Sequence, residues 1–552
     1  MWATVASVRV SSRGGGAVCT GCSSVGGMRP LSAAAPLPGL RPGSRASNAG
    51  GAERAGRCPG PRASNARARQ VARGVRPPRI EYVELRALSR LAAPAVAALL
   101  ALTTGCTGET VQGRPGASGL RDPYFPRAGN GGYQVDHYAL DLDYDPADGQ
   151  LHGTAVITAR AEQALSSFNL DFSGLDVEGV TVQGEGARYN RTGTELTVRP
   201  AEDLEKGEVF RTRVDYSGKP KALADPDGAK EGWVTTKDGA VAVGEPVGSM
   251  TWFPGNHHPS DKAAYDITLT VPRGYEAVSN GELRSRTGDA DGRTVFAWHS
   301  PEPMASYLAT AAVGPYKVTT GRTASGIGLY SAVAPGEEAA TTGPLARLPE
   351  MVDWSAGRFG PYPFATAGAI VVPAGTLTYA LETQGRPVYS GAPEDEELVV
   401  HELAHQWFGD SVSPKSWKDI WLNEGFATYA EWLWAEDHGG PTAQQHFEAF
   451  LAGDTDVDKD AGVDWDAFPP ASPPGPEEIT AAPVYYRGAM VLHRIRQEVG
   501  DEKFFALVRG WAADHRHGNA STAEFTAYAE KRTGQDLKKV WDVWLYGKAR
   551  PK

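Results

Sequence analysis

Hydrophobic and polar residues alternate along the first half of the folded chain. The alternation runs from Tyr133 to Tyr144 and from Gly153 to Ala159, with a turn at Asp145 to Gly149 between them. A third alternating run, Tyr265 to Val271, ends at Pro272. Period-two alternation is typical of half-buried strands. Several short strands at short spacing predict an antiparallel β-sandwich or saddle.

The pattern changes after about residue 345, where helical runs rich in Trp, Ala, Glu and Leu begin. The chain is therefore predicted to be α+β, with an N-terminal antiparallel β domain over 131–320 and a mainly helical domain over 321–552. The boundary is expected near Gly321-Arg322.

The first 82 residues show no hydrophobic period and consist mostly of Gly, Ala, Arg, Pro and Ser. Such a segment cannot bury enough apolar surface to offset its chain entropy. We expect 1–82 to be disordered, or to be an overextended reading frame with the true start near Val83.

A signal peptide is predicted over 83–106. A short basic stretch precedes the apolar run Leu91 to Leu102, and small residues then lead to Cys106. This order is typical of a secretory signal and too short for a membrane span. The ending resembles a bacterial lipobox, which would make Cys106 a lipid attachment site. Plain secretion is the alternative. Residues 107–130 are expected to form a flexible linker.

Composition excludes several kinds of site and partner for residues 107–552. All four cysteines lie within the first 106 residues, which excludes a disulfide scaffold, a thiolate metal site and a cysteine nucleophile further on. The first 106 residues also hold 15 of the 55 basic and 3 of the 66 acidic residues, so 40 basic and 63 acidic side chains remain for 107–552. A body this acidic argues against nucleic acid as a partner.

The candidate chemistry begins with an HExxH motif at His401-Glu402-Leu403-Ala404-His405. On a helix, residues four apart share one face, so both imidazoles can reach one metal ion, and Glu402 can act on a water there. The acidic residues from Glu394 to Glu397 suit the positive end of such a helix.

A second helical run supplies a third metal ligand. Glu424 lies nineteen residues beyond His405, within Trp417 to Glu431. Two imidazoles and one carboxylate suit zinc, since calcium and magnesium prefer oxygen ligands. Three protein ligands leave one position open, as in catalytic zinc sites. By spacing alone, a surface carboxylate remains the alternative for Glu424.

The stretch from His401 through Asp410, together with Trp421 through Ala427, resembles the aminopeptidase N family of gluzincin zinc peptidases. The resemblance implies a thermolysin-like fold for the helical domain, one zinc ion per chain held by His401, His405 and Glu424, and Glu402 as the catalytic base. It covers most of 130–552. Family members usually continue into further domains. This sequence ends where the catalytic domain is expected to close, so a short, two-domain member is expected.

The resemblance also assigns residues for substrate binding. Tyr379 to Thr383 matches the family's Gly-x-Met-Glu-Asn loop only at Glu382, which would bind the substrate's free α-amine. Tyr485, followed by Tyr486-Arg487-Gly488, matches the tyrosine that stabilises the oxyanion, with Tyr486 as a packing residue. Glu245 matches a second amine anchor. The nearby His257 and His258 are expected to be structural.

These features predict a zinc-dependent aminopeptidase that acts on peptides with a free N-terminus. A zinc endopeptidase and a catalytically inactive binding protein remain the alternatives. The protein is expected to be a monomer and a lipoprotein on the bacterial cell surface, or secreted, with membrane contact only through a lipid at Cys106.

Overall fold

The computed structural model describes residues 112–288 and 290–551. The expected extension over 1–82, the signal segment over 83–106 and Cys106 lie outside the described residues. Within the described part, no helix combines the length and hydropathy needed to cross a bilayer.

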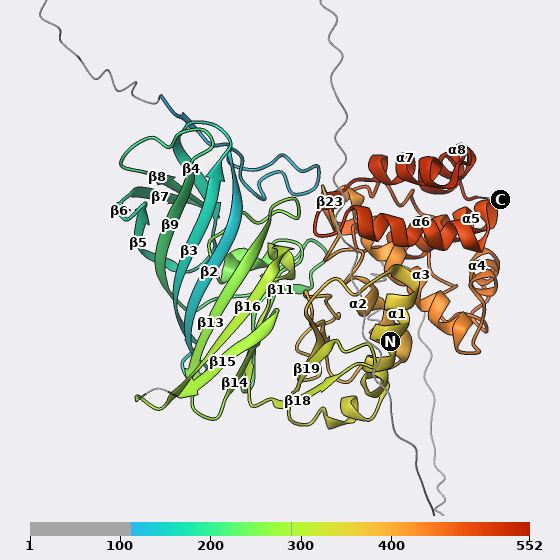
Figure 1. The fold of residues 1–552 in the computed structure, drawn as a ribbon, viewed down its shortest axis with the longest axis horizontal. Helices are drawn as coiled ribbons and strands as arrows, with labels where there is room; N and C mark the ends of the chain where they lie inside the picture. The colour runs from blue at the N-terminus through green and yellow to red at the C-terminus, as the bar shows by residue number, and fades with distance from the viewer. Residues whose placement is uncertain (1–111, 289, 552) are drawn as a thin grey trace, which may run out of the picture. The chain divides into compact units, whose positions relative to one another are not determined.

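The first domain is built from β-sheets, as the alternating pattern predicted (Figure 1). In its largest sheet all neighbouring strands are antiparallel except β2 and β13, which pair in parallel. Its strands, in sheet order, are β15 Glu282–Gly288, β16 Arg293–Ala305, β13 Lys262–Pro272, β2 Tyr133–Asp145, β3 Gln150–Ala161, β9 Val209–Gly218, β5 Asp176–Val182 and β6 Glu185–Gly186. Along β2 and β13 buried side chains alternate with more exposed ones, so one face of this sheet meets the core.

Two smaller sheets complete this domain among the described residues. One contains β10 Leu223–Ala224, β11 Lys230–Thr236, β12 Gly239–Val243, β17 Ala311–Gly314 and β14 Glu276–Ser279. The other contains β1 Arg114–Pro115, β4 Leu165–Asp171, β8 Glu195–Arg199 and β7 Arg188–Thr192. All residues of β12 and β17 are buried.

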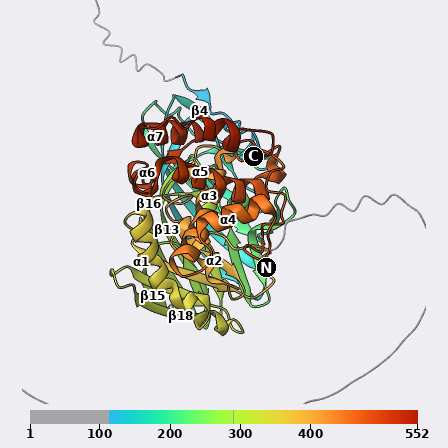
Figure 2. The ribbon, with the colours of Figure 1, turned by 90° about the vertical axis from the view of Figure 1, so that its right-hand side faces the viewer.

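The second domain is mainly helical, and its helices α5, α6 and α7 lie side by side in both views (Figures 1 and 2). The helices are α1 Leu348–Phe359, α2 Glu396–Ala404, α3 Trp421–Asp437, α4 Ala443–Ala452, α5 Gly488–Val499, α6 Asp501–Asp514, α7 Thr522–Thr533 and α8 Lys538–Val540. This domain also contains a sheet of β18 Lys317–Arg322, β19 Gly328–Val333, β20 Thr366–Val372 and β21 Val388–Ser390, and β22 Ser413–Pro414 pairs with β23 Asn519–Ala520. The α+β prediction is confirmed.

Two expected boundaries differ from the structure. Gly321 and Arg322 lie inside β18, which pairs with β19, so the chain passes from one domain's sheets to the other between Gly314 and Lys317. Over its described part, the segment expected to be a flexible linker is instead folded onto both domains. Its β1 strand pairs with β4, and the Asp122 carboxylate accepts hydrogen bonds from Ser416 and Trp417. These contacts join residues that are far apart in the sequence, so local composition cannot reveal them.

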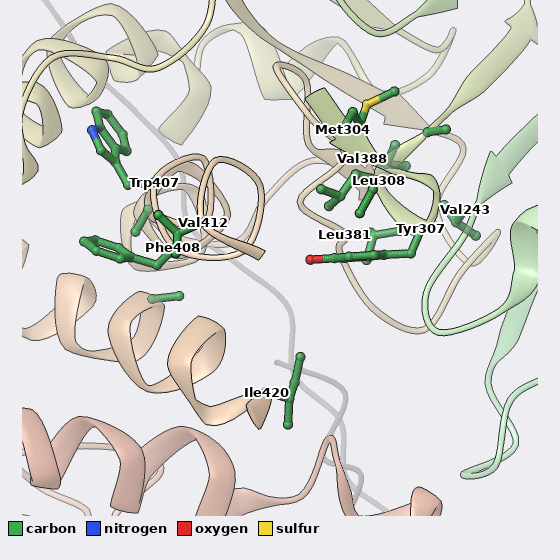
Figure 3. Close-up of a cluster of buried hydrophobic side chains, with 14 of the residues drawn as sticks. Val243, Met304, Tyr307, Leu308, Leu381, Val388, Trp407, Phe408, Val412 and Ile420 are labelled. Carbon is green, nitrogen blue, oxygen red and sulfur yellow. The ribbon is translucent and has the colours of Figure 1, made fainter. Parts of the chain in front are cut away.

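One continuous hydrophobic core joins the two domains. In Figure 3, Tyr307 reaches from the first domain toward the segment that carries Phe408 and Val412. Its hydroxyl donates to the Gly409 carbonyl at 3.0 Å and accepts a hydrogen bond from Asn423 at 3.4 Å. The chain that follows the HExxH motif is therefore fixed against the β domain.

Candidate metal centre and active site

The HExxH segment lies on α2 and its C-terminal cap. Asp395 caps the helix, since its carboxylate accepts a hydrogen bond from the Leu398 amide at 2.9 Å. His401 lies in the last turn, and His405 follows directly after the helix. Both imidazoles are buried, each with 2% of its surface exposed.

Helix α3 brings Glu424 to the two histidines. Its Oε2 lies 3.3 Å from His401 Nε2 and 3.5 Å from His405 Nε2. Burial alone would raise the pKa of Glu424, but the neighbouring His405 and His401 lower it to about 2. This carboxyl is therefore ionised at neutral pH, as a metal ligand must be.

The spacing of these three side chains fits zinc. Bonds of about 2.0–2.1 Å in a tetrahedral site place neighbouring ligand atoms about 3.3 Å apart, close to the distances found here. All three candidate ligand atoms lie within 4.8 Å of one another. His401, His405 and Glu424 are thus the residues that would hold the ion.

Each histidine is also held by its second ring nitrogen. His401 Nδ1 lies 2.5 Å from Glu431 Oε1, and His405 Nδ1 lies 3.1 Å from the Phe408 carbonyl. Both Nε2 atoms therefore face the metal position, and a carboxylate–histidine pair of this kind orients metal ligands. No sequence motif indicated a role for Glu431. It lies two helical turns after Glu424, and that spacing could have indicated a shared face.

Glu402 is buried beside the metal ligands. One of its carboxylate oxygens lies within 4.8 Å of ligand atoms of Glu382 and His405. Burial raises the pKa of Glu402 to about 7. A carboxyl with a pKa near neutrality is suited to accept and return a proton.

Glu382 and Glu245 meet at the other end of the site. Their oxygens, with those of Glu424, form a further group within 4.8 Å. Glu382 is 3% exposed, and its Oε1 has no hydrogen-bond partner. Burial, together with Glu382 and Glu424, raises the pKa of Glu245 well above its usual range. Converging carboxylates of this kind favour a bound cation.

Gln406 connects the Glu382 loop to the HExxH segment. Its side chain donates to the Glu382 carbonyl at 3.2 Å and accepts from the Gly385 amide at 2.7 Å. Leu381 is fixed from the other side by paired backbone hydrogen bonds with Val388. The loop that carries Glu382 is thus tied to the residue directly after His405, a role of Gln406 that no sequence pattern indicated.

The neighbouring residues Tyr485 and Tyr486 face different surroundings. They lie on a π-helical turn, η7 Pro483–Arg487, that leads into α5. The Tyr485 ring stacks on His401, with ring centroids 6.0 Å apart and planes 15° apart. Tyr486 stacks on Phe450 with centroids 4.7 Å apart. Only Tyr485 therefore faces the metal ligands. Burial and nearby carboxylates, Glu424 first, raise its pKa well above the usual value, which keeps the phenol protonated.

Two glycines allow this arrangement. A Cβ atom on Gly425 would lie 2.8 Å from the Gly488 carbonyl carbon, and one on Gly488 would lie 2.9 Å from the Gly425 Cα. Helices α3 and α5 therefore approach closely where Glu424 and Tyr485 lie, and a larger residue would force them apart.

The two histidines that were expected to be structural, His257 and His258, lie away from this centre. His257 Nε2 lies 3.0 Å from the Phe253 carbonyl, and His258 Nδ1 lies 2.7 Å from Ser260 Oγ. Both are buried in the first domain, and neither belongs to a group of potential metal ligands among the described residues.

Comparisons with known proteins agree with this geometry. Residues 386–544 match the model of the peptidase family M1 domain, and residues 134–308 match that of the peptidase M1 N-terminal domain. The solved structure of an M1 zinc metallopeptidase from Deinococcus radiodurans is 30% identical, with a TM-score of 0.72, over 79% of this chain and 98% of that chain. A mutant of that enzyme bound to a Tyr-Ser-Ala substrate matches equally well, with a TM-score of 0.72.

Curated relatives are more distant. Tricorn protease-interacting factor F2 of Thermoplasma acidophilum is 24% identical over 76% of this chain and 54% of its own length. Glutamyl aminopeptidase of Bos taurus is 29% identical over 56% of this chain and 34% of its own length. The matched part thus spans about half of these curated relatives or less.

Proposed function

The chain belongs to the M1 family of zinc metallopeptidases, and on this premise we propose that it is a zinc-dependent aminopeptidase that removes the N-terminal residue from peptides. One observation carries the proposal. Glu245 and Glu382 converge with Glu424 beside the metal ligands, and the buried Glu382 Oε1 has no partner. Among the described residues, neither Glu245 nor Glu382 forms an ion pair with Lys or Arg. A substrate ammonium would fill that role.

The residues have distinct tasks in the reaction. Bound zinc supplies a water of lowered pKa and polarises the scissile carbonyl. The Glu402 carboxylate accepts the proton of the attacking water and delivers it to the leaving amine nitrogen. The Tyr485 hydroxyl donates a hydrogen bond to the oxygen on which negative charge develops.

The amine anchors set which bond is cut. Glu382 and Glu245 hold the N-terminal ammonium, so that only the first peptide bond reaches Glu402. A substrate with a blocked amine would leave these buried carboxylates unpaired, which costs binding free energy.

The test is hydrolysis of aminoacyl-arylamides by the zinc-loaded protein, with N-acetylated analogues beside them. Cleavage of the free-amine substrates alone, abolished by a chelator and by Glu402→Gln, is the expected result. Cleavage of blocked internal peptides would indicate an endopeptidase instead. Folded, zinc-loaded protein that cleaves neither class would indicate a binding protein.

We also propose that the protein acts outside the cytoplasm, held by a lipid on Cys106. The basic stretch, apolar run and small residues before Cys106 support this location. Membrane fractionation of the wild type and of Cys106→Ala tests it. Release of the variant into the soluble fraction is expected, and equal partition of both would exclude the anchor. The monomeric state stays a prediction, testable by sedimentation.

A further inference from the structure

The segment 112–131, here called the N-terminal strap, begins and ends on the β domain. Near its start, β1 pairs with β4. At its end, the Gly129 amide donates to Asp171 Oδ2 at 3.0 Å, and the Asn130 amide donates to Asn256 at 2.5 Å. Between these points the strap reaches the catalytic domain, where Tyr124 donates its hydroxyl hydrogen to the Pro473 carbonyl at 2.7 Å.

The part of the strap that reaches across is a tight loop. Backbone hydrogen bonds close it from Leu120 to Ala128 and from Arg121 to Pro126, at 3.2 and 3.1 Å. Arg121 has a φ of 60°, a left-handed conformation that costs a non-glycine residue about 1 kcal/mol or more. Such strain persists where surrounding contacts over-determine the backbone. The loop is therefore a specifically built feature.

Asp122 joins this loop to the catalytic domain. Its Oδ1 accepts hydrogen bonds from the amides of Tyr124 at 2.9 Å and Phe125 at 3.1 Å. Its Oδ2 accepts hydrogen bonds from Ser416 Oγ at 2.7 Å and the Trp417 amide at 3.0 Å. The Asp122 side chain is fully buried, and His258 Nε2 lies 3.5 Å away. Both oxygens are thus used, Oδ1 within the strap itself and Oδ2 on the catalytic domain.

The residues that Asp122 holds lead directly into the helix of the third metal ligand. Trp417 opens a short turn, η5 Trp417–Asp419, and α3 begins at Trp421. The Glu424 amide then donates to the Ile420 carbonyl at 3.1 Å. Only four residues separate the η5 turn from Glu424, so a shift of this turn changes where the Glu424 carboxylate lies.

Aromatic packing follows the same route. Phe125 of the strap contacts Trp417, with ring centroids 5.9 Å apart, and Trp417 contacts Tyr307 at 5.1 Å. Tyr307 in turn is hydrogen-bonded to Gly409 and Asn423, which lie next to the segments that carry His405 and Glu424. The strap is thus linked, through hydrogen bonds and through packed rings, to the segments that carry the metal ligands.

We propose that Asp122 is a positioning residue for the zinc site, which fixes the start of α3 from the strap and thereby places Glu424. The proposal rests on the zinc site of the proposed function. Zinc affinity is measured without substrate, so a failure of this proposal and a failure of the aminopeptidase assignment are distinguishable.

The test uses the full chain with Asp122→Ala and Asp122→Asn, and zinc affinity is measured by competition with a chelator. Residues that orient metal ligands contribute about 10–100-fold to metal affinity. Because Asp122 acts through α3, we expect about a 10-fold loss for Asp122→Ala. Asparagine keeps one acceptor oxygen, so Asp122→Asn should lose less. Because the amine anchors lie outside α3, kcat should fall while KM stays near that of the wild type.

Two further variants keep the result decisive. Gln163→Ala removes only a strap contact on the β domain, the 3.4 Å hydrogen bond to the Pro115 carbonyl, and should leave zinc affinity unchanged. If Asp122→Ala does not fold, Ser416→Ala removes one of the bonds to Asp122 and should still weaken zinc binding severalfold. Faster amide exchange at Trp417 to Glu424 should accompany the loss. A folded Asp122→Ala or Ser416→Ala protein with a lower Tm but wild-type zinc affinity would overturn the proposal.

Discussion

The metal end and the amine end of the active site are built in different ways. At the metal end, His401 and Glu424 come from helices α2 and α3 and His405 from the cap of α2, and each imidazole has a second partner that fixes its ring. At the amine end, Glu382 and Glu245 come from loops of two different domains, and Glu382 Oε1 has no partner.

The two ends therefore differ in how they are prepared to bind their ligands. The metal end already contains the hydrogen bonds that orient its ligands, so it is preorganised for one ion. At the amine end, burial raises the pKa of both Glu245 and Glu382, so these carboxyl groups ionise fully only when a cationic group binds. Substitutions at the metal end should therefore change zinc affinity, and substitutions at the amine end should change the kinetics on free-amine substrates.

The largest effect is expected for Tyr485→Phe. Loss of one donor to a developing oxyanion costs about 10²–10³-fold in kcat, and KM should change little because the ground state does not need this donor. Tyr486→Phe is the matched control, since Tyr486 packs on Phe450 instead. Steady-state kinetics on one aminoacyl-arylamide checks both. Equal losses in the two variants would contradict the assignment of Tyr485.

Glu382→Gln should weaken the amine end alone. Truncating one partner of a buried charge pair costs about 2–5 kcal/mol, so kcat/KM for free-amine substrates should fall about 10²-fold. Zinc affinity should change little, because Glu382 is not a metal ligand. The measurement pairs kinetics with zinc content. A variant that loses zinc together with activity would show that the two ends are not separable here.

Glu431→Gln should weaken the metal end alone. Its carboxylate holds His401 Nδ1, and loss of such a partner lowers metal affinity about 10–100-fold. KM of the zinc-saturated variant should match the wild type. Glu436→Gln is the control on the same helix, because Glu436 pairs with Arg496 and not with a ligand. Chelator competition that ranks the two variants equally would reject this role for Glu431.

The last expected effect concerns stability, not activity, near the amine end. Glu231 Oε2 accepts a hydrogen bond from the Val247 amide at 2.9 Å, two residues after Glu245, and burial raises the pKa of Glu231 to about 8. The folded state therefore keeps a proton that the unfolded chain, with a pKa near 4.5, releases. The stability that this proton contributes is complete below pH 4.5 and is lost as the pH rises through 8.

Replacing Glu231 by Gln should remove this pH dependence. Each unit of pKa difference corresponds to about 1.4 kcal/mol, so between pH 5 and pH 8 the Tm of the wild type should fall by more than that of the variant. The exposed Glu185→Gln should follow the wild type. Parallel Tm curves for all three proteins would show that Glu231 is ionised in the fold.

Local patterns predicted two strands of the first domain and a shared helix face for two histidines. Alternating residues gave β2 and β13 close to their observed bounds, and spacing alone indicated His401 and His405 on one face. Each of these features depends on residues near one another in sequence, where periodicity carries the information.

The amine end and the strap depend on contacts between distant segments. Glu382 and Glu245 are 137 positions apart in the numbering, and only a family resemblance pointed to both. Asp122 lies in a stretch whose composition suggested a flexible linker, yet its partners Ser416 and Trp417 lie in the other domain. No periodicity of the sequence encodes such pairs.

The π-helical turn that carries Tyr485 makes the site sensitive to insertions and deletions. A π-helical turn accommodates one more residue than an α-helical turn. Removing one residue between Pro483 and Tyr485 would allow ordinary helical pairing and rotate the tyrosine by about 100° around the helix axis. Arg487 is the last residue of the turn. Its guanidinium donates hydrogen bonds to the Trp544 and Val543 carbonyls of a second π-helical turn. The number of residues in this turn thus matters as much as their identity, and deletion of the single codon for the buried Val484 would turn the phenol away from the metal ligands.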